Sequence, residues 1–413
     1  MTPSLEQYRS IVGDAVIQHL MQLARHLRGL KIVHVNSTSE GGGVAEILQC
    51  LLPLKKSLGL DVSWEVTSGD REFYECTKKF HNALQGNKVA INNAMLSHYE
   101  KINSINYERL KDTLENADIV FIHDPQPAPL LRFCADRKGR WFWRCHIDAS
   151  HPYRPVWKYL RDFVTLYDAS IWSLPSFAQN LPHPMYVVPP SIDPLSPKNI
   201  DLDSSDLKDV YKTWHLDESR PIITQISRFD RFKDPLGVIE SYKLAKKFSP
   251  LQLVLAGSGA NDDPEGAEVL EEVELARDND PDIHIIVLPP DAHRKINALQ
   301  RVSNIILQKS LREGFGLTVT EALWKQKAVI GGDTGGIRIQ VFNHHTGFLV
   351  NSPEGAALRI RYLLKHRDIL ENMGNKAKEF VRENFLITRH LREYLTLIIS
   401  IMHNSKERII LQA

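Results

Sequence analysis

The sequence lacks the features that mark several classes of protein. Its four cysteines are far apart and form no CxxC pair, which argues against a disulfide framework and a zinc site and favours reduced, buried thiols. No apolar run approaches the ~18 residues of a membrane span, and the polar N-terminus is unlike a signal peptide. The formal net charge is only +1, and a nucleic-acid partner would require a basic stripe. We expect a cytoplasmic protein with neither a membrane nor a nucleic acid as its partner.

The pattern of apolar runs predicts an α/β protein. Short β-rich runs alternate with helical stretches along the whole chain, which is typical of parallel sheets with crossover helices. Predicted helices include Pro235–Phe248, Glu265–Asp278, Leu317–Trp324 and Glu354–Lys365. The predicted strands are Lys31–Ser37, Val62–Val66, Ala117–His123, Trp141–Ile147, Ala169–Trp172, Tyr186–Val188, Ile222–Ser227, Leu251–Ala256, Ile283–Leu288, Asn304–Leu307 and Ala328–Gly331.

The length of 413 residues predicts two domains. The alternation is interrupted at Ser191–Ser205, a stretch rich in Pro, Ser and Asp that we interpret as a linker. We therefore expect a first domain over residues 1–200 and a second over 201–385, with a last helix at about 386–413 returning to the first. Two doubly wound, Rossmann-like domains facing a central cleft would bind ligands beyond the carboxyl ends of their strands.

The most informative motif is S-L-R-E-G-F-G-L-T-V-T-E-A, from Ser310 to Ala322. It follows a predicted strand, contains Gly314 and Gly316, and leads into a predicted helix. Free N–H groups and the positive end of a helix dipole make such a turn an anion site. Because Glu313 and Glu321 bracket that site, we expect a phosphorylated sugar donor whose hydroxyl groups they hold.

Two cations stand in the loop that follows the strand at Ile222–Ser227, within I-S-R-F-D-R-F-K-D. Arg228 and Lys233 can converge on one diphosphate, with a planar fork from Arg and a mobile charge from Lys. The alternative is surface ion pairing with Asp230 and Asp234. Beside the Glu313 motif, we favour the diphosphate.

Three further motifs follow predicted strands of the first half. The first, S-T-S-E-G-G-G-V-A-E, is a glycine-rich turn that allows close approach of a ligand, or a flexible turn. The second and third are H-D-P-Q-P and R-C-H-I-D-A-S, whose Asp124, His146 and Asp148 could bind sugar hydroxyls or move a proton. Taken alone, His146 is more often structural, and an H-x-D pair supplies too few ligands for a metal.

Two other glycine motifs carry weaker signals. Gly331–Ile337 follows a predicted strand, and a tight turn is as good an interpretation of it as a ligand contact. Gly257 and Gly259 lack the third glycine of a dinucleotide fingerprint, which excludes an NAD site there.

Taken together, these motifs resemble the retaining glycosyltransferases of family 4, which have the GT-B fold and a signature of two glutamates separated by seven residues. The resemblance covers nearly the whole chain. Within that family, the first half is most similar to the trehalose synthases of the glycosyltransferring type. The strings that carry this likeness are E-Q-Y-R-S-I-V-G, H-V-N-S-T-S-E-G-G-G-V-A-E, K-K-F-H-N-A-L-Q-G, H-D-P-Q-P and W-R-C-H-I-D-A-S.

The resemblance implies a reversible reaction in which ADP- or UDP-glucose and free glucose give α,α-trehalose with retention of configuration. It implies catalytic roles for Arg228, Lys233, Glu313 and His146. It implies acceptor contacts from Asp124, Gln126, His146 and Asp148. The implied donor-binding residues are Gly42, Gly43, Arg228, Lys233, Gly314, Phe315, Gly316, Leu317 and Glu321. No tightly bound cofactor or metal site is implied, only a loose stimulation by Mg²⁺, and the expected assembly is a homodimer.

Three alternatives stay open at this point. One is a retaining trehalose phosphorylase that uses glucose 1-phosphate, although such chains are longer. Another is a family 4 transferase with other sugars. The third is a non-catalytic sensor of sugars or nucleotides. The sequence argues against it, because no position of the motifs described above is lost.

Overall fold

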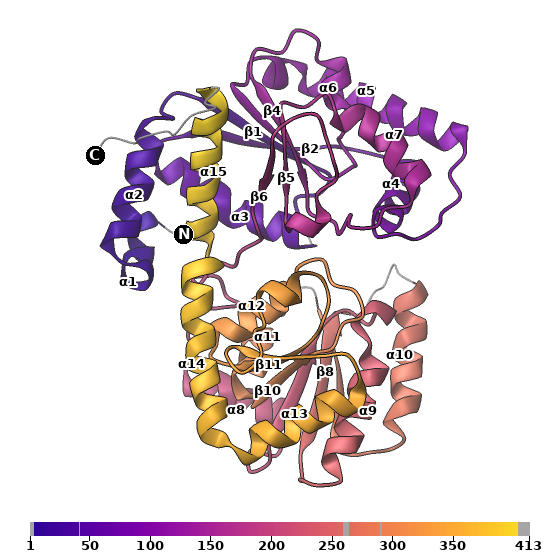
Figure 1. Ribbon diagram of the computed structural model, residues 1–413, viewed down its shortest axis with the longest axis vertical. Coiled ribbons are helices and arrows are strands. Elements are labelled where there is room, and N and C mark those ends of the chain that lie inside the picture. Colours follow the sequence, from indigo (N-terminus) through magenta and orange to yellow (C-terminus); the bar gives the residue numbers. More distant parts are fainter. Residues whose placement is uncertain (1–3, 41, 259–263, 290, 404–413) are drawn as a thin grey trace. The chain divides into compact units, whose positions relative to one another are not determined.

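The computed structural model describes residues 4–40, 42–258, 264–289 and 291–403 (Figure 1). The chain divides into two compact units, Met1–Pro190 with Ile387–Ala413, and Ser191–Leu386. The division falls at residue 190, where we predicted a boundary at 200. Each unit is built around one six-stranded parallel sheet flanked by helices.

The sheet of the first unit has the strand order β2-β1-β3-β4-β5-β6. Its strands are β1 Lys31–Asn36, β2 Asp61–Val66, β3 Ile119–His123, β4 Arg140–Cys145, β5 Ala169–Trp172 and β6 Met185–Val187. One group of helices consists of α2 Asp14–Arg25, α3 Gly42–Ser57 and α15 Ile387–Met402, which pack against one another. The other group consists of α4 Arg71–Leu84, α5 Asn93–Glu115, α6 Leu130–Phe133 and α7 Arg154–Val164.

The sheet of the second unit has the strand order β12-β11-β10-β7-β8-β9. Its strands are β7 Ile222–Ile226, β8 Gln252–Ser258, β9 Ile283–Leu288, β10 Ile305–Gln308, β11 Ala328–Gly332 and β12 Gly347–Val350. Its helices are α8 Ser204–Thr213, α9 Pro235–Lys246, α10 Pro264–Arg277, α11 His293–Val302, α12 Leu317–Trp324, α13 Pro353–Lys365 and α14 Arg367–Asn384.

Neighbouring residues of these strands enter different cores. Ile223 of β7 packs in the cluster that contains α9 and α13, while Ile222 packs in the cluster that contains α8 and α11. Successive side chains of a strand point to opposite faces of a sheet, and both faces are covered here. This explains why the strands are continuous apolar runs, and the predicted α/β class is confirmed.

The predicted linker is wrong. Much of Ser191–Ser205 packs on the second unit, where Asn297 Nδ2 of α11 donates to the carbonyls of Pro197 and Ile200 at 3.0 and 2.8 Å. Its prolines and aspartates give an irregular backbone, but side chains of α11 satisfy that backbone. Strand β12 was missed because only three apolar residues, Phe348–Val350, follow its glycine.

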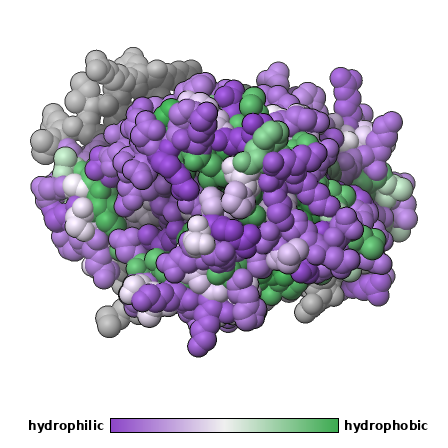
Figure 2. Space-filling view, turned by 90° about the horizontal axis from the view of Figure 1, so that it is seen from below, coloured by the Kyte–Doolittle hydropathy of each residue, from purple (hydrophilic) through white to green (hydrophobic). Residues whose placement is uncertain are grey.

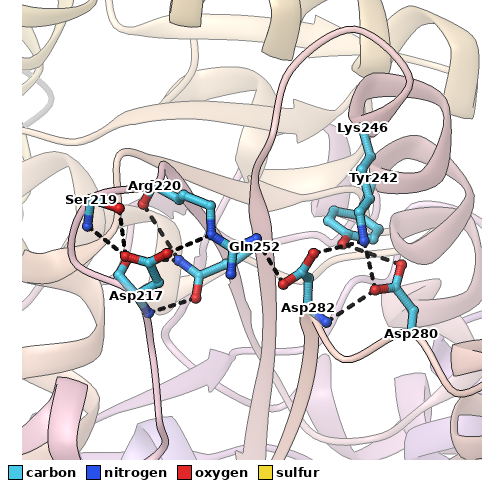
Figure 3. Close-up of polar contacts among 8 residues, drawn as sticks. All are labelled: Asp217, Ser219, Arg220, Tyr242, Lys246, Gln252, Asp280 and Asp282. Carbon is cyan, nitrogen blue, oxygen red and sulfur yellow. Dashed lines mark hydrogen bonds and ion pairs between the residues drawn. The ribbon is translucent and has the colours of Figure 1, made fainter.

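A polar network joins the segments that precede β8 and β9 (Figure 3). It lies at the amino ends of these strands, whereas the candidate site described below lies at the carboxyl ends. Gln252, at the start of β8, bonds the backbone of Asp217. Lys246 of α9 lies 2.7 Å from Asp280 and 2.8 Å from Asp282, just before β9. Burial is the largest single influence and acts to raise the pKa of each carboxyl. The hydrogen bonds and charge of Lys246 act together with the backbone N–H of Asp282 on Asp280, and with Arg220 on Asp282, and the net effect is to lower both pKa values. This network fixes the segments that lead into β8 and β9.

Hydrophilic side chains predominate on the face seen in Figure 2, and the hydrophobic ones lie in small separate groups. Within the described part of the chain, no helix combines the length and apolar character of a membrane span.

Candidate active site

The Glu313 motif forms the turn between β10 and α12, where sequence reasoning put it. Glu313 is only 8% exposed. Its carboxylate accepts hydrogen bonds from Lys233 Nζ at 2.8 and 2.7 Å and from Ser310 Oγ at 3.2 Å. Lys233 ends the short 3-10 helix η3, Arg231–Lys233, between β7 and α9. Two residues that are 80 positions apart are thus joined by a partly buried ion pair.

The turn is held by Gly316 and by a glutamine that sequence reasoning missed. Gly316 caps α12 at φ +83°, and a Cβ there would lie 3.2 Å from Cγ of Glu313. Gln340 Nε2 donates to the carbonyl of Phe315 at 2.7 Å, and its Oε1 accepts from Thr320 Oγ1 at 2.6 Å. Gln340 is buried, and its two hydrogen bonds hold the turn to the start of α12. Nothing in the local sequence distinguishes this glutamine from a surface one.

The glycine loop at Gly331–Ile337 packs directly on this turn. Gly336 N donates to the carbonyl of Gly314 at 3.0 Å, and a Cβ on Gly336 would lie 2.4 Å from Cα of Phe315. Gly335 has φ +45°, and a Cβ there would lie 1.6 Å from the carbonyl oxygen of Glu313. Close backbone packing therefore accounts for these glycines.

Arg228 follows β7 in the same loop as Lys233. Its side chain is 65% exposed, and its guanidinium lies 3.2 Å from Asp230 Oδ2, the surface pairing considered above. Asp234 pairs instead with Lys309, a buried lysine that sequence reasoning did not single out. A Cβ on Gly257 would lie 1.8 Å from the carbonyl oxygen of Ser227, so this glycine lets β8 approach the loop. Gly259 lies outside the described residues.

Glu321 lies on the inner side of α12, where its side chain is almost fully buried. One turn later, Lys325 Nζ donates to Gln300 Oε1 at 2.7 Å and to Asn199 Oδ1 at 3.0 Å. Burial lowers the pKa of Lys325 to about 7, against the opposing attraction of Glu321. The predicted contact of Glu321 with ribose hydroxyls stays a prediction.

In the first unit, the glycine-rich turn joins β1 to α3. Gly42 and Gly43 are exposed at the first positions of α3, and Gly42 has φ +79°, which favours glycine. Asn36 at the end of β1 holds the turn, because its Nδ2 donates to the carbonyl of Thr38 at 2.7 Å. Trp64 Nε1 in turn donates to Asn36 Oδ1 at 2.8 Å. Gly41 is outside the described residues.

Asp124 and His146 are brought together at the carboxyl ends of β3 and β4. Asp124 has φ +62°, and its Oδ1 accepts from the backbone N–H of His146 at 2.7 Å. Burial raises the pKa of this carboxyl to about 7, although the N–H of His146 and the charge of Arg144 oppose the shift. Both side chains are partly exposed.

The other two predicted acceptor residues are also partly exposed. Asp148 Oδ1 accepts from Ser150 N at 2.9 Å, and the backbone carbonyl of Gln126 accepts from Asn103 Nδ2 at 3.1 Å. Among the described contacts, none joins these two side chains to His146, so their place in a site stays a prediction.

A row of buried groups that sequence reasoning missed ends at His146. Nε2 of His146 lies 3.0 Å from Nδ1 of His123, and Nε2 of His123 lies 3.0 Å from Nδ1 of His34. Nε2 of His34 lies 2.7 Å from Nζ of Lys55 in α3. Burial lowers the pKa of each histidine, that of His123 to about 3, and lowers the pKa of Lys55 to about 7. The available signal was a histidine within the apolar strand K-I-V-H-V-N.

No group of three or more His, Cys, Asp or Glu side chains that could hold a metal ion occurs in residues 4–403 outside the gaps named above. The cations that follow β7 and β10 in the second unit include Arg228, Lys233 and Lys309.

Comparison with known proteins adds an identity to this geometry. Residues 34–179 match the family model of the N-terminal domain of trehalose synthase, and residues 209–380 match that of glycosyl transferases group 1. The chain is 46% identical over 399 residues to the trehalose synthase of Thermococcus litoralis, across 95% of this chain and 96% of that protein. The chain belongs to the trehalose synthase family. The predicted family is thus confirmed.

Two further relatives of this trehalose synthase family member have lower identity. The trehalose synthase of Rubrobacter xylanophilus is 40% identical over 406 residues, across 97% of both chains. The trehalose phosphorylase of Pleurotus pulmonarius is 30% identical over 432 residues, which span 92% of this chain but 58% of that protein. The chain is therefore a glycosyltransferase, and its reaction is a glycosyl transfer of trehalose metabolism.

Solved structures confirm the predicted GT-B fold. The trehalose-6-phosphate enzyme structure from E. coli with bound UDP-2-fluoro glucose aligns with a TM-score of 0.74 at 14% identity, over 89% of this chain and 98% of that one. Sucrose-phosphate synthase from Thermosynechococcus elongatus aligns with a TM-score of 0.67 at 15% identity, over 91% of this chain and 100% of that one. At such identities the likeness shows the fold alone.

Proposed function

We propose that this protein transfers glucose from a nucleoside diphosphate glucose to free glucose, reversibly and with retention, to form α,α-trehalose. The observation that carries the proposal is the 46% identity, over nearly the whole length of both chains, to a protein named trehalose synthase. The geometry of the second unit supports a nucleotide-sugar donor, because a cation, a buried carboxylate and a helix N-terminus meet there.

The donor's diphosphate would meet Arg228, Lys233 and the backbone N–H groups of Gly314–Leu317. A cation–phosphate contact at about 4 Å in an effective dielectric near 20 is worth roughly 4 kcal/mol before desolvation is subtracted. Such contacts stabilise the negative charge that develops on the leaving diphosphate. In this proposal Glu313 holds the glucosyl hydroxyls and Glu321 the ribose hydroxyls.

The exposed turn at Gly42 and Gly43 would contact the donor phosphate or sugar from the first unit. His146 would contact the transferred glucose, and Asp124, Gln126 and Asp148 would contact the acceptor.

The transfer would proceed on one face of the sugar. The bond from glucosyl C1 to the diphosphate oxygen breaks, and a bond from C1 to the anomeric oxygen of the acceptor forms on the same face. The acceptor's hydroxyl proton passes to the departing phosphate oxygen, so no protein base is required. The proposal needs no tightly bound cofactor, and any effect of Mg²⁺ would be stimulation.

A trehalose phosphorylase is the second candidate, because the trehalose phosphorylase of Pleurotus pulmonarius is 30% identical over 92% of this chain. It would place inorganic phosphate where the nucleoside diphosphate is proposed. Incubation of the protein with trehalose and phosphate distinguishes the two: release of glucose 1-phosphate without a nucleotide favours the phosphorylase, and release of nucleotide glucose from trehalose and ADP or UDP favours the synthase.

Assembly and location remain part of the proposal. We propose a homodimer, which light scattering of the purified chain would test, acting in the cytoplasm, which cell fractionation would test.

A further inference from the structure

Four buried or half-buried side chains form a continuous hydrogen-bonded row through the first unit. It runs from Lys55 of α3 through His34 of β1 and His123 of β3 to His146, just after β4, with N···N distances of 2.7, 3.0 and 3.0 Å. Lys55, His34 and His123 are buried, and only His146 is partly exposed. The neighbouring imidazole rings are stacked, with centroids 5.3 Å apart in both pairs. We call these four residues the relay.

A charged lysine gives the relay a direction. An ammonium group has three donors and no acceptor, whereas a neutral imidazole has one donor and one acceptor nitrogen. Nε2 of His34 must therefore accept from Lys55, which leaves the proton of that ring on Nδ1. Nδ1 of His34 then donates to Nε2 of His123, and Nδ1 of His123 donates to Nε2 of His146. The last ring is left with its proton on Nδ1.

The surroundings of Lys55 suit the charged form. Its Nζ lies 5.0 Å from the ring centroid of Phe121 and 4.9 Å from that of Tyr394, and aromatic faces attract cations. Burial opposes the charge and lowers the pKa of this lysine to about 7. The direction of the relay is therefore fully set below neutral pH.

The three histidines are kept neutral, as this argument requires. Burial lowers the pKa of all three, and the nearby charges act in the same sense. Outside the relay itself, the charged or titratable groups that face it are Arg144 of β4, His390 and Tyr394 of α15, and Asp124, whose carboxylate accepts from the backbone N–H of His146. Arg144 is itself buried at the exposed end of the relay, where it disfavours an imidazolium.

We propose that Lys55 is a positioning residue, which acts through His34 and His123 to hold His146 in the Nδ1–H tautomer, so that Nδ1 can donate a hydrogen bond to an oxygen of the bound sugar. The proposal rests on the proposed function in one respect, the contact between His146 and the transferred glucose. Among the described residues, Nδ1 of His146 has no hydrogen-bond partner, whereas its Nε2 is engaged by the relay. Metal-bound histidines are held in one tautomer in the same manner, by a hydrogen bond to the ring nitrogen that does not bind the metal.

A role of Lys55 in positioning His146 can be distinguished by experiment from a role in stabilising the fold. A buried charge costs desolvation energy, so replacement of Lys55 by an apolar side chain of similar length should not destabilise the fold. The informative variant is Lys55→Met. Lys56→Met is its matched control, because Lys56 is the next residue of α3 and is exposed.

The direct test is ¹⁵N NMR of the full chain labelled at histidine, recorded well below the pKa of Lys55, together with steady-state kinetics. Assignment of His146 comes from the spectrum of His146→Gln. We expect His146 of the wild type to carry its proton on Nδ1 and Lys55→Met to give a mixture of tautomers. We expect kcat of Lys55→Met to fall by about 10- to 100-fold, in the range found when a residue that orients a functional histidine is replaced, with thermal stability equal or higher. Lys56→Met should match the wild type in all three measurements.

His34→Phe breaks the relay at a second point. A phenyl ring preserves the stacking on His123 but can neither accept a hydrogen bond from Lys55 nor donate one to His123. It should change the tautomer of His146 even though Lys55 is present. A proton on Nε2 of His146 in the wild type would overturn the proposal, as would an unchanged tautomer in both variants. A changed tautomer with unchanged kcat would overturn the positioning role. The NMR result needs no turnover, so failure of the proposed reaction and failure of the relay are distinguishable.

Discussion

Lys233 Nζ lies 2.8 and 2.7 Å from the two carboxylate oxygens of Glu313, so the cation proposed for the diphosphate and the carboxylate proposed for the sugar are one ion pair. Both side chains are largely buried, at 18% and 8% exposure. A buried charge that loses its partner is costly, so each residue preorganises the other.

This pair predicts strong non-additivity. Lys233→Ala and Glu313→Ala should each lower kcat/KM by about 10²-fold or more, the loss seen when a preorganised charge contact is removed. The double variant should lose much less than the product of the two. A double-mutant cycle on kcat/KM and on thermal stability measures the coupling, expected at about 0.5–3 kcal/mol. Purely additive effects would show that the ion pair is unimportant in solution.

Arg228 should act on turnover without acting on stability. Its side chain is 65% exposed, so Arg228→Ala should leave the melting temperature unchanged. Loss of a charge-assisted contact to the diphosphate should cost about 1.5–3 kcal/mol of transition-state stabilisation. Arg231→Ala is the matched control, because Arg231 lies in the same loop, is half exposed and pairs with Glu272 at 2.8 Å. Equal kinetics of the two variants would remove Arg228 from the mechanism.

Gly316 should be needed both for its backbone angle and for the space beside Glu313. Gly316→Ala forces a side chain into the left-handed region, at about 1–2 kcal/mol, and places Cβ 3.2 Å from Cγ of Glu313. Gly59→Ala isolates the first effect, because Gly59 ends α3 as a left-handed glycine, with φ +80° and no atom within 4 Å of a Cβ. Both variants should lose similar stability, and only Gly316→Ala should lose activity. Full activity of Gly316→Ala would show that the turn tolerates a shift of Glu313.

The network in Figure 3 predicts a pH-dependent effect on the second unit. The pKa values of Asp280 and Asp282 are lowered, so the stability that they contribute is present above about pH 4 and is lost as the pH falls through their folded pKa values. Lys246→Ala should destabilise this unit by about 1–2 kcal/mol at neutral pH, since the pairs are partly exposed. The difference from wild type should vanish in acid, as judged by urea unfolding at several pH values.

Lys247→Ala is the control for that experiment, because Lys247 is adjacent and exposed. A deficit of Lys246→Ala that persists unchanged in acid would mean that its alkyl packing matters and its ion pairs do not.

The fold was largely predictable from the sequence, because both sheets are parallel and buried on two faces. Such strands are continuous apolar runs, and β5 and β9 have the predicted bounds. The exceptions have local causes. Strand β12 is too short to stand out, and Ser191–Ser205 has the composition of a linker but is held by side chains of α11.

The placement of the candidate site residues was predictable where they lie in a local sequence motif. Glu313, Gly316 and Lys233 lie in motifs with their own spacing, and the structure places them at the ends of strands or beside them. Gln340 and Lys55 could not be found this way. Lys55 stands beside Lys56 in the sequence as if both were solvated. The pairing of β1 with β3 puts His34 opposite Phe121, and His123, two residues further along β3, lies on the same face of the sheet within 3.0 Å of His34. Long-range contacts of this kind follow from sheet order, which no single segment specifies.

The most direct test of the account is one product analysis. The purified protein is incubated with ¹³C-labelled free glucose and, separately, UDP-, ADP- or GDP-glucose, and the products are identified by NMR. The account predicts α,α-trehalose with one labelled glucosyl unit and an equal amount of nucleoside diphosphate from at least one donor. A β-linked product, or sugar transfer only to phosphorylated glucose, would contradict it.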